Sequence, residues 1–275
     1  MSDLQVRQEP LRIVPTAVAS RPWRALGGKG SLHLVERHAR VYRYLWLMLA
    51  SGIGEPLFYL LSIGVGLGHL VPAVGGVSYT AYVAPALLAT SSMNGAIYDS
   101  TFNVFFQIKY AKTYEAALAT PMRATDLALG QVLWALIRSG IYALAFTVVM
   151  AAMGLFQSYW AIGVLPAAVL TGFAFAAAGM AATTFMRSWQ DFEFVTLVSV
   201  PLFLFSATFF PLSVYPRAVA IVVECTPLYQ AVTLMRGLAL GVVGPGLLWR
   251  AAYLAVLGLA GLYLAGRRVG RLLLT

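Results

Sequence analysis

The sequence predicts an all-α membrane protein with six transmembrane helices. Of its 275 residues, 60% are hydrophobic and 11% are charged, and the mean hydropathy is +0.78, far above the range of soluble domains. Residues 56–98 and 139–186 form stretches of 43 and 48 residues without Asp, Glu, Lys or Arg. Each is about twice the ~20 residues that cross a bilayer as a helix, so each most simply holds two spans. A transmembrane barrel would need short alternating strands, which these continuous apolar runs are not.

Six spans are expected, in order along the chain, at 44–66, 80–106, 127–154, 160–186, 192–212 and 247–266. Because this number is even, both termini lie on the same side of the membrane. The segments on that side hold fifteen Lys and Arg residues, whereas the segments on the other side hold three. Lys and Arg accumulate on the cytoplasmic side of membrane proteins, so both termini are predicted to be cytoplasmic.

Four regions are expected along the chain. Residues 1–30 hold five basic side chains, two acidic ones and three prolines without an apolar core, which predicts a disordered cytosolic tail and not a cleavable signal. An amphipathic helix at 31–43, the six-span domain at 44–266 and a basic cytosolic tail at 267–275 follow.

The segment 31–44 predicts an amphipathic interface helix. Apolar residues recur there at helical spacing, with charged residues between them: Leu32, Val35, Ala39 and Tyr42 are apolar, and Glu36, Arg37, Arg40 and Arg43 are charged. Such a helix can lie flat at the inner headgroup layer with its arginines facing anionic lipid. The alternative is a basic flank that only orients the first span.

Residues 112–122, here named the elbow, carry charge between two very apolar regions. Lys112 to Thr120 are mostly good helix formers, and Pro121 then ends the helix because it cannot donate a backbone N–H. Thr125 and Asp126 stand where the cap of the next span belongs, and Asp126 suits the positive end of that helix. This pattern predicts a short helix across the ends of two spans; the alternative is a plain polar loop.

The segment 213–246 is too polar and too often broken by Pro and Gly to cross the membrane, yet too apolar for a solvated loop. We expect short, re-entrant-like helices that dip into the outer leaflet. Irregular backbone at that depth must be shielded by protein or must line a water-filled cavity. The segment is therefore predicted to line or cover a path.

Three charged residues fall inside predicted spans: Glu55, Asp99 and Arg138. Each costs ~2.5 to 3.5 kcal/mol at a helix centre, so each should find a partner. Glu55 and Arg138 both lie eleven residues from the inner boundary, about 16 Å at 1.5 Å per residue, which predicts an ion pair between them. Asp99, about seven residues deep, is the second choice for Arg138. The alternative has Arg138 reaching the inner interface and Glu55 protonated.

Aromatic residues gather on the predicted outer side. They are Tyr79, Tyr82, Tyr159, Trp160, Phe209, Phe210, Tyr215 and Tyr229. Most such rings are anchors at headgroup depth. On the covering segment we also expect a second role, as platforms for sugar rings, and the predicted residues of this outer lid and path are Phe209, Phe210, Tyr215, Tyr229, Gln230 and Arg236.

The sequence offers no catalytic or metal centre. A single cysteine excludes an intrachain disulfide framework, and the three scattered histidines lack metal-ligand spacing. The one Gly-Lys pair, Gly28-Lys29, is followed by Gly30 and does not form a phosphate-binding loop. Paired carboxylates and nucleophile triads at usable spacing are also missing, so we expect no catalytic site on this chain.

Five stretches of the sequence resemble the permease subunits of type 2 ABC exporters. They are "EPLFYLLSIGVGLG" (55–68), "YTAYVAPALLATSSM" (79–93), "YEAALATPMRATDLALGQ" (114–131), "PLFLFSATFFPLSVYP" (201–216) and "TPLYQAVTLMRGLALG" (226–241). The nearest similarity is to the nodulation-type branch, which exports lipooligosaccharide or polysaccharide. One departure is Gln230, because such permeases often have His at this position. A glutamine does not titrate, so hydrogen bonding is the remaining role for Gln230.

The resemblance implies a homodimeric permease that pairs with two copies of a separate ATP-binding subunit. It implies no cofactor on this chain, with ATP and Mg on the partner, and a place in the bacterial inner (cytoplasmic) membrane among its lipids. In that family the elbow is the helix that docks in a cleft of the ATPase. The residues that match it are Tyr114, Glu115, Leu118, Ala119, Thr120, Pro121 and Met122.

These observations predict the membrane subunit of an ATP-driven exporter for an amphipathic, glycan- or lipid-linked molecule, with no role in nucleic-acid binding. The nearest alternative is a drug or antibiotic efflux permease of the same architecture. An ion-coupled secondary transporter would need titratable groups at a midplane site and inverted repeats; Glu55 and Asp99 supply two such groups, but no repeat is evident. An enzyme of lipid metabolism would need clustered His or Asp near the interface.

Overall fold

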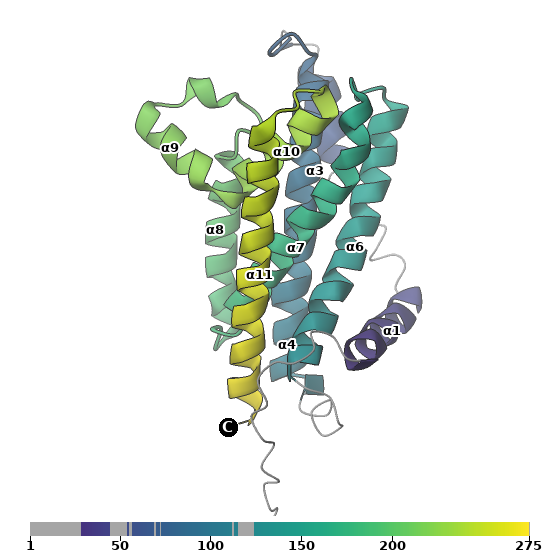
Figure 1. Ribbon diagram of the computed structural model, residues 1–275, viewed down its shortest axis with the longest axis vertical. Helices are drawn as coiled ribbons and strands as arrows, with labels where there is room; N and C mark the ends of the chain where they lie inside the picture. The colour runs from purple at the N-terminus through teal and green to yellow at the C-terminus, as the bar shows by residue number, and fades with distance from the viewer. Residues whose placement is uncertain are drawn as a thin grey trace, which may run out of the picture.

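The computed structural model describes residues 29–44, 54, 57–68, 70–71, 73–111, 113–114 and 124–274. Over these ranges the chain is helical apart from turns and one isolated bridge between Val74 and Val77. The all-α prediction is confirmed for the described part of the chain. Figure 1 shows the long helices running side by side along one axis.

The described helices, in chain order, are α1 (Lys29–Tyr44), η1 (Leu60–Leu67), α3 (Tyr79–Tyr98), η2 (Asp99–Asn103), α4 (Val104–Lys109), α6 (Ala124–Ala152), η3 (Tyr159–Gly163), α7 (Val164–Thr183), η4 (Trp189–Asp191), α8 (Phe192–Leu204), η5 (Leu212–Val214), α9 (Arg217–Cys225), α10 (Pro227–Leu240) and α11 (Pro245–Leu274). Of these, η1 and η2 are π-helical, and η3, η4 and η5 are short 3₁₀ turns.

Three of these helices are long and apolar enough to cross a membrane. They cover Asp126–Ala152, Tyr159–Thr183 and Pro245–Arg271, close to the predicted third, fourth and sixth spans. The bent pair α9 and α10 would make a fourth if it counted as one span. The protein is therefore a multi-pass membrane protein, and the total of six spans stays a prediction.

The second and fifth predicted spans have shapes that the sequence did not predict. The predicted second span is α3, η2 and α4 in succession, so its helix contains a π-helical turn at Asp99–Asn103. The fifth was predicted too long, since α8 ends at Leu204 after 13 residues. Ala207 has a left-handed φ of 56°, and a residue in this conformation cannot continue a right-handed helix. Most of the predicted first span lies outside the described residues.

The helix α7 lies at the centre of the bundle, against α3, α6 and α11. Small residues allow this close packing: a Cβ at Gly261 of α11 would lie 2.7 Å from the carbonyl carbon of Ala177 of α7. On its other side, a Cβ at Gly172 of α7 would lie 2.7 Å from Oγ of Ser139 of α6. The helices therefore meet at backbone distance, as is typical of helix pairs in membranes.

The segment 213–246 forms short helices, as predicted. The helix α9 and the helix α10 meet at an angle of 84°. Thr226 stands at the break and caps α10 by accepting a hydrogen bond from the Tyr229 N–H at 3.4 Å, and Pro227 follows as the first helical residue. In Figure 1 these helices lie at the end of the bundle opposite α1 and the C-terminus.

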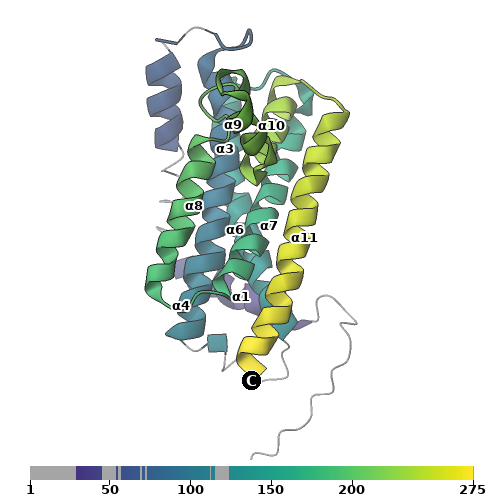
Figure 2. The same cartoon turned by 90° about the vertical axis from the view of Figure 1, so that its left-hand side faces the viewer.

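The segment 31–43 is helical, as predicted, and α1 packs on the bundle through residues outside the predicted apolar stripe. Ser31 and Leu34 are buried, while Leu32 is 64% exposed. The reason lies on α6, where Gly130 leaves room for Leu34: a Cβ at Gly130 would lie 2.9 Å from the Leu34 Cδ2. As Figure 2 shows, α1 lies across the bundle near its α4 end.

Candidate functional site

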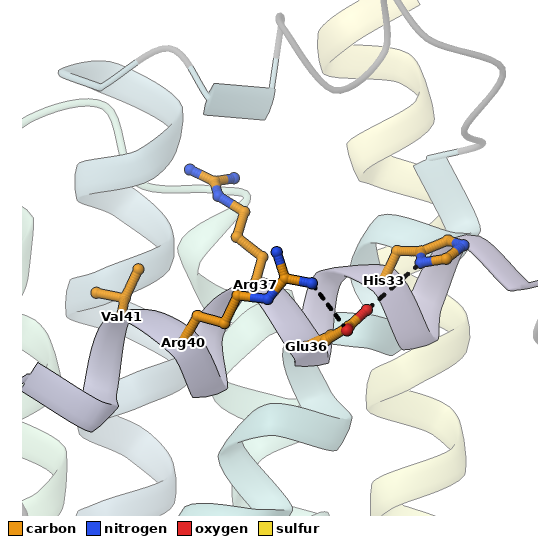
Figure 3. Close-up of a pocket in the computed structure, with 5 residues that line it drawn as sticks. All are labelled: His33, Glu36, Arg37, Arg40 and Val41. Atoms are coloured by element: carbon orange, nitrogen blue, oxygen red, sulfur yellow. Dashed lines mark hydrogen bonds and ion pairs between the residues drawn. The ribbon is translucent and has the colours of Figure 1, made fainter.

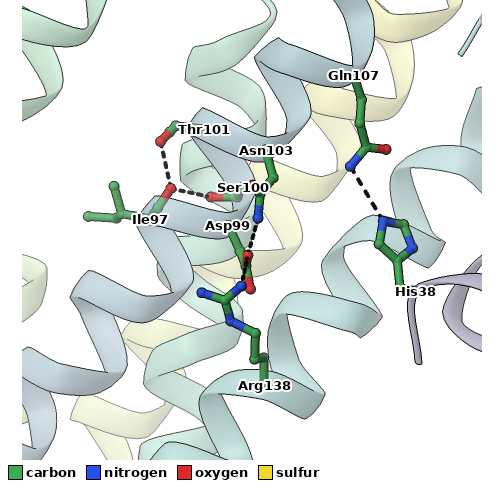
Figure 4. Close-up of polar contacts among 8 residues, drawn as sticks. All are labelled: His38, Ile97, Asp99, Ser100, Thr101, Asn103, Gln107 and Arg138. Atoms are coloured by element: carbon green, nitrogen blue, oxygen red, sulfur yellow. Dashed lines mark hydrogen bonds and ion pairs between the residues drawn. The ribbon is translucent and has the colours of Figure 1, made fainter. Parts of the chain in front are cut away.

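A buried ion pair joins α6 to the π-helical turn η2 inside the bundle. The Arg138 Nη1 lies 2.8 Å from the Asp99 Oδ1, and their side chains are 9% and 1% exposed. The amide of Asn103, one turn along η2, also donates to the Asp99 Oδ1. Figure 4 shows the three side chains converging. Removing one member of such a pair costs about 3 to 5 kcal/mol, because the other is left buried and unpaired.

This pairing joins Arg138 to the residue that the sequence placed second. Helical depth favoured Glu55, but the π-helical turn inserts extra backbone at Asp99, and Asp99 meets Arg138 there. Glu55 lies outside the described residues, so its pairing with Arg138 stays a prediction. Asn103 was missed, although its place four residues after Asp99 on a helix could have indicated it.

Helix α7 supports the π-helical turn through a side-chain hydrogen bond to the backbone of the turn. Thr183 of α7 donates from Oγ1 to the Ser100 carbonyl oxygen at 3.0 Å, and the Thr101 hydroxyl donates to the Ile97 carbonyl at 2.6 Å. Gly179 lets Ser100 approach α7 closely. These hydroxyls add hydrogen bonds to carbonyl groups within the turn and just before it. The turn is therefore held from two sides, by Arg138 and by Thr183.

The elbow connects the lower end of α4 with α6. Thr113 and Tyr114 are described, and Tyr114 is 2% exposed. Burial raises the pKa of its hydroxyl. Glu115, Leu118, Ala119, Thr120, Pro121 and Met122 lie outside the described residues, so their role stays a prediction.

Helix α6 resumes at Ala124, so Thr125 and Asp126 lie in its first turn and not at its cap. The prediction that these two residues cap the helix is therefore wrong. Asp126 is buried and still lies near the positive end of the helix, where a carboxylate is stabilised by the helix dipole. Tyr114 is therefore buried near the start of the elbow, and Asp126 is buried in the first turn of the helix that follows it.

At the opposite end, Arg236 of α10 holds the loop that follows α8. Its guanidinium lies 3.8 Å from the centre of the Tyr82 ring. Its Nε donates to the Tyr82 carbonyl at 3.1 Å, and its Nη2 donates to the Ala207 carbonyl at 2.9 Å. Ala207 is the residue with the left-handed φ, so Arg236 stabilises a strained backbone. The residue predicted for the outer path is here a structural clamp.

Gln230 makes the hydrogen bonds expected for a residue without a titratable group. Its amide nitrogen donates to the Glu224 carbonyl, and its Oε1 accepts from the Arg250 Nη1 at 2.9 Å. It therefore ties α9, α10 and α11 together. Arg250 was missed as a partner, because its residue type and position indicated only a charge on the outer side.

The four predicted aromatic residues of this end do not form one platform. The Phe209 ring packs against Phe203 of α8, with centroids 5.2 Å apart, whereas Phe210 is 56% exposed. Tyr229 is buried beneath Arg250, and Tyr215 donates to the Leu204 carbonyl at 3.4 Å. Of the four, Phe210 alone offers a largely free ring.

The outward face of α1 carries an open hollow of about 370 Å³ lined by His33, Glu36, Arg37, Arg40 and Val41 (Figure 3). The Glu36 carboxylate accepts from the Arg40 Nη2 at 2.9 Å, and this contact holds the pKa of Glu36 below its usual range. Arg37 and Arg40 leave the face basic beside the exposed Val41.

The sequence pattern of the family described as "ABC-2 type transporter" matches residues 32–240. The chain belongs to this family. Membership identifies it as a permease subunit of an ABC transporter, whose ATP-binding subunit is a separate chain. Its described site is therefore a set of positioning contacts within the membrane part of the transporter.

Similar proteins include Nodulation protein J of several rhizobia. The chain is 37% identical to that of Rhizobium leguminosarum bv. trifolii over 70% of this chain and 74% of the relative. It is 32% identical to that of Rhizobium meliloti (strain 1021) over 70% and 74%. It is also 32% identical to that of Rhizobium leguminosarum bv. viciae over 70% and 75%. The predicted resemblance to the nodulation-type branch of ABC-2 permeases is confirmed.

Proposed function

We propose that this chain is the transmembrane subunit of an exporter that moves an amphipathic glycan- or lipid-linked molecule out of the cytoplasm. The observation that carries this proposal is the similarity to Nodulation protein J over 70% of the chain. Two copies of the chain form the path along their interface, and two ATP-binding subunits, which hold ATP and Mg, dock on the elbows from the cytoplasm. Both termini lie on that side of the bacterial inner membrane.

The anchoring of the elbow supports a mechanical role. A segment that transmits force must be stiff where it joins the membrane helices, and buried residues flank the elbow there: Tyr114 near its start and Asp126 in the first turn of α6. Beyond Tyr114 the chain leads back through α4 to the π-helical turn, where Asp99 and Arg138 join it to α6. Movement of the elbow therefore reaches the centre of the bundle.

Helix α8 supports a path between two copies. None of its residues is buried, and large apolar side chains such as Phe194, Leu197 and Val200 are at least half exposed. In a membrane such a face contacts lipid, a second copy or the transported molecule. The basic outward face of α1 rests on the inner headgroup layer in this arrangement.

The experiment is reconstitution of the chain with its ATP-binding subunit in lipid vesicles. Wild type should form a complex and export only with ATP. Thr120→Trp in the elbow should weaken binding of the ATP-binding subunit at least about tenfold, which corresponds to 1.4 kcal/mol. Ile162→Trp is the matched control, because Ile162 is 87% exposed in η3, which packs beside α10 at the end of the bundle away from the elbow.

Transport driven by an ion gradient without the ATP-binding subunit would overturn the proposal. The transported molecule is identified by comparing lipid extracts of cells with and without the chain. Accumulation of a glycolipid inside cells that lack it supports the proposed substrate class. Unchanged extracts together with increased drug sensitivity would instead identify an efflux permease.

A further inference from the structure

Helix α1 joins the bundle through a histidine that the mechanism above does not use. Leu34 packs on α6 beside Gly130. One turn further along α1, the His38 ring stacks on Trp134 of α6, with centroids 5.5 Å apart and planes at 22°. The other edge of the ring reaches α4, where the His38 Nε2 lies 3.4 Å from the Gln107 Nε2 (Figure 4). His38 is thus a contact among three helices.

The two ring nitrogens have different partners, which define one protonation state. The His38 Nδ1 lies 2.8 Å from the Leu34 carbonyl oxygen, so Nδ1 carries the proton and donates it. Nε2 is then left with a lone pair, which accepts from the Gln107 amide. The neutral ring satisfies both contacts. A proton on Nε2 would place the His38 N–H against the N–H of the Gln107 amide, unless that amide flipped to present its oxygen.

Gln107 continues this contact into the elbow. Its backbone carbonyl accepts from the Thr113 hydroxyl at 3.3 Å, and Tyr114, the next residue, is buried. One residue of α4 therefore touches α1 with its side chain and the start of the elbow with its backbone. A change at His38 alters the packing of the residue from which the elbow begins.

We propose that His38 is a positioning residue, which in its neutral form docks α1 on α4 and α6 and so fixes the start of the elbow. Protonation of His38 releases α1 and loosens the elbow. The docking of α1 is independent of the proposed function, whereas its effect on ATP-driven transport rests on the elbow being the docking site of the ATP-binding subunit.

The electrostatics of the site agree with this role. Burial lowers the pKa of His38, the Leu34 carbonyl acts in the opposite direction, and the Arg37 cation on the same helix lowers the pKa further. The groups that reach the ring from α6 and α4, Trp134 and Gln107, are uncharged. A histidine whose pKa is lowered by docking stabilises docking fully above its ordinary pKa of about 6.5. That contribution is lost as the pH falls through the lowered value.

The first experiment measures hydrogen exchange of residues 29–44 in the full chain in lipid nanodiscs. Protection factors, which remove the intrinsic effect of pH on exchange, are compared at pH 7.5 and pH 5.5. Wild type should lose protection severalfold at the lower pH, since each unit of lowered pKa weakens docking of the protonated form about tenfold. His38→Gln, which cannot titrate, and His38→Phe, which keeps the stack on Trp134, should each show equal protection at both values.

Two further variants make the test specific. His33→Gln is the matched control, because His33 is exposed on the same helix and contacts Glu36; it should behave like wild type. Gln107→Glu places a carboxylate beside the imidazolium and should abolish the loss of protection at pH 5.5. The proposal would be overturned if wild type were equally protected at both pH values. It would also be overturned if both His38 variants lost as much protection at pH 5.5 as wild type.

The second experiment measures ATP hydrolysis by the reconstituted complex against pH. The activity of wild type relative to His38→Gln should fall between pH 7.5 and pH 5.5, with Gln107→Glu restoring it. If the ATP-binding subunit does not bind the chain at all, the proposed function fails, but the exchange experiment still decides the role of His38. If exchange depends on His38 while hydrolysis does not, the elbow part of the proposal is wrong.

Discussion

Replacement of Arg138 tests whether the buried ion pair braces the bundle. Arg138→Met removes the guanidinium and leaves Asp99, which is 1% exposed, without its 2.8 Å partner. Desolvation of the remaining carboxylate should cost about 3 to 5 kcal/mol. Roughly 2 to 4 °C of melting temperature corresponds to 1 kcal/mol for chains of this size. We therefore expect the melting temperature in detergent to fall by about 6 to 20 °C.

The double variant separates the pair from its surroundings. Asp99→Asn combined with Arg138→Met removes both charges, so that no buried charge is left without its partner. The double variant should therefore be more stable than Arg138→Met, so that the effects of the two single changes are not additive. Arg187→Met is the control, because Arg187 is exposed, and should change stability by no more than about 0.5 kcal/mol.

Glu55→Gln, measured in parallel, distinguishes the two candidate partners of Arg138. If Glu55→Gln is as damaging as Arg138→Met while Asp99→Asn has no effect, the carboxylate that matters is Glu55. If Arg138→Met melts at the same temperature as Arg187→Met, or if the double variant recovers nothing, then the pair does not brace the bundle.

Three other changes test different contacts. Arg236→Lys keeps the charge but loses the planar group that stacks on Tyr82 and holds the Ala207 carbonyl; it should cost about 1 to 3 kcal/mol and raise proteolysis in the loop after α8. Gly261→Ala places a Cβ 2.7 Å from the backbone of α7, and overpacking of about 1 to 3 kcal/mol should lower the melting temperature. The Asp191 carboxylate accepts hydrogen bonds from the backbone N–H groups of residues 187 and 188, which holds its pKa below the usual range. Its contribution to stability should therefore be present above pH 3.8 and be lost as the pH falls through the lowered pKa. Asp191→Asn should lack this dependence in acid titrations followed by circular dichroism.

Each of these has a matched control and a contradicting result. Arg217→Lys, on α9, should be silent, and equal proteolysis in Arg236→Lys and wild type would argue against the clamp. Gly246→Ala has nothing within 4 Å of its added Cβ, so it should be neutral; a neutral Gly261→Ala would show that α7 and α11 can separate at no cost. Identical acid titrations of Asp191→Asn and wild type would remove the carboxylate from the cap.

Composition predicted the helical class and the apolar spans because these follow from local chemistry. The lipid-compatible runs at 127–154, 160–186 and 247–266 correspond to three long helices. Pro and Gly predicted the broken segment 213–246, which forms α9 and α10. The resemblance to ABC-2 permeases depended on residue identity along the chain and needed no three-dimensional information.

Packing decided the features that depend on contacts distant in sequence. Depth along a helix favoured Glu55 for Arg138, but the extra residue of a π-helical turn cannot be read from hydropathy, and that turn brings Asp99 to Arg138. The early end of α8 depends on Arg236, about 30 residues later, which binds the carbonyl of Ala207. Neither partner is visible in a local window of sequence.

The sequence by itself determined that this chain is helical, crosses a membrane and belongs with ABC-2 permeases, because apolar length, charge distribution and motif identity are properties of the chain in order. The tertiary structure alone decided which face of α1 is buried and which residues contact the start of the elbow. Leu34, which lies outside the predicted apolar stripe, is buried because Gly130 on α6 leaves space at that point. This contact joins two helices nearly a hundred residues apart, so the spacing of apolar residues in either helix alone does not predict it.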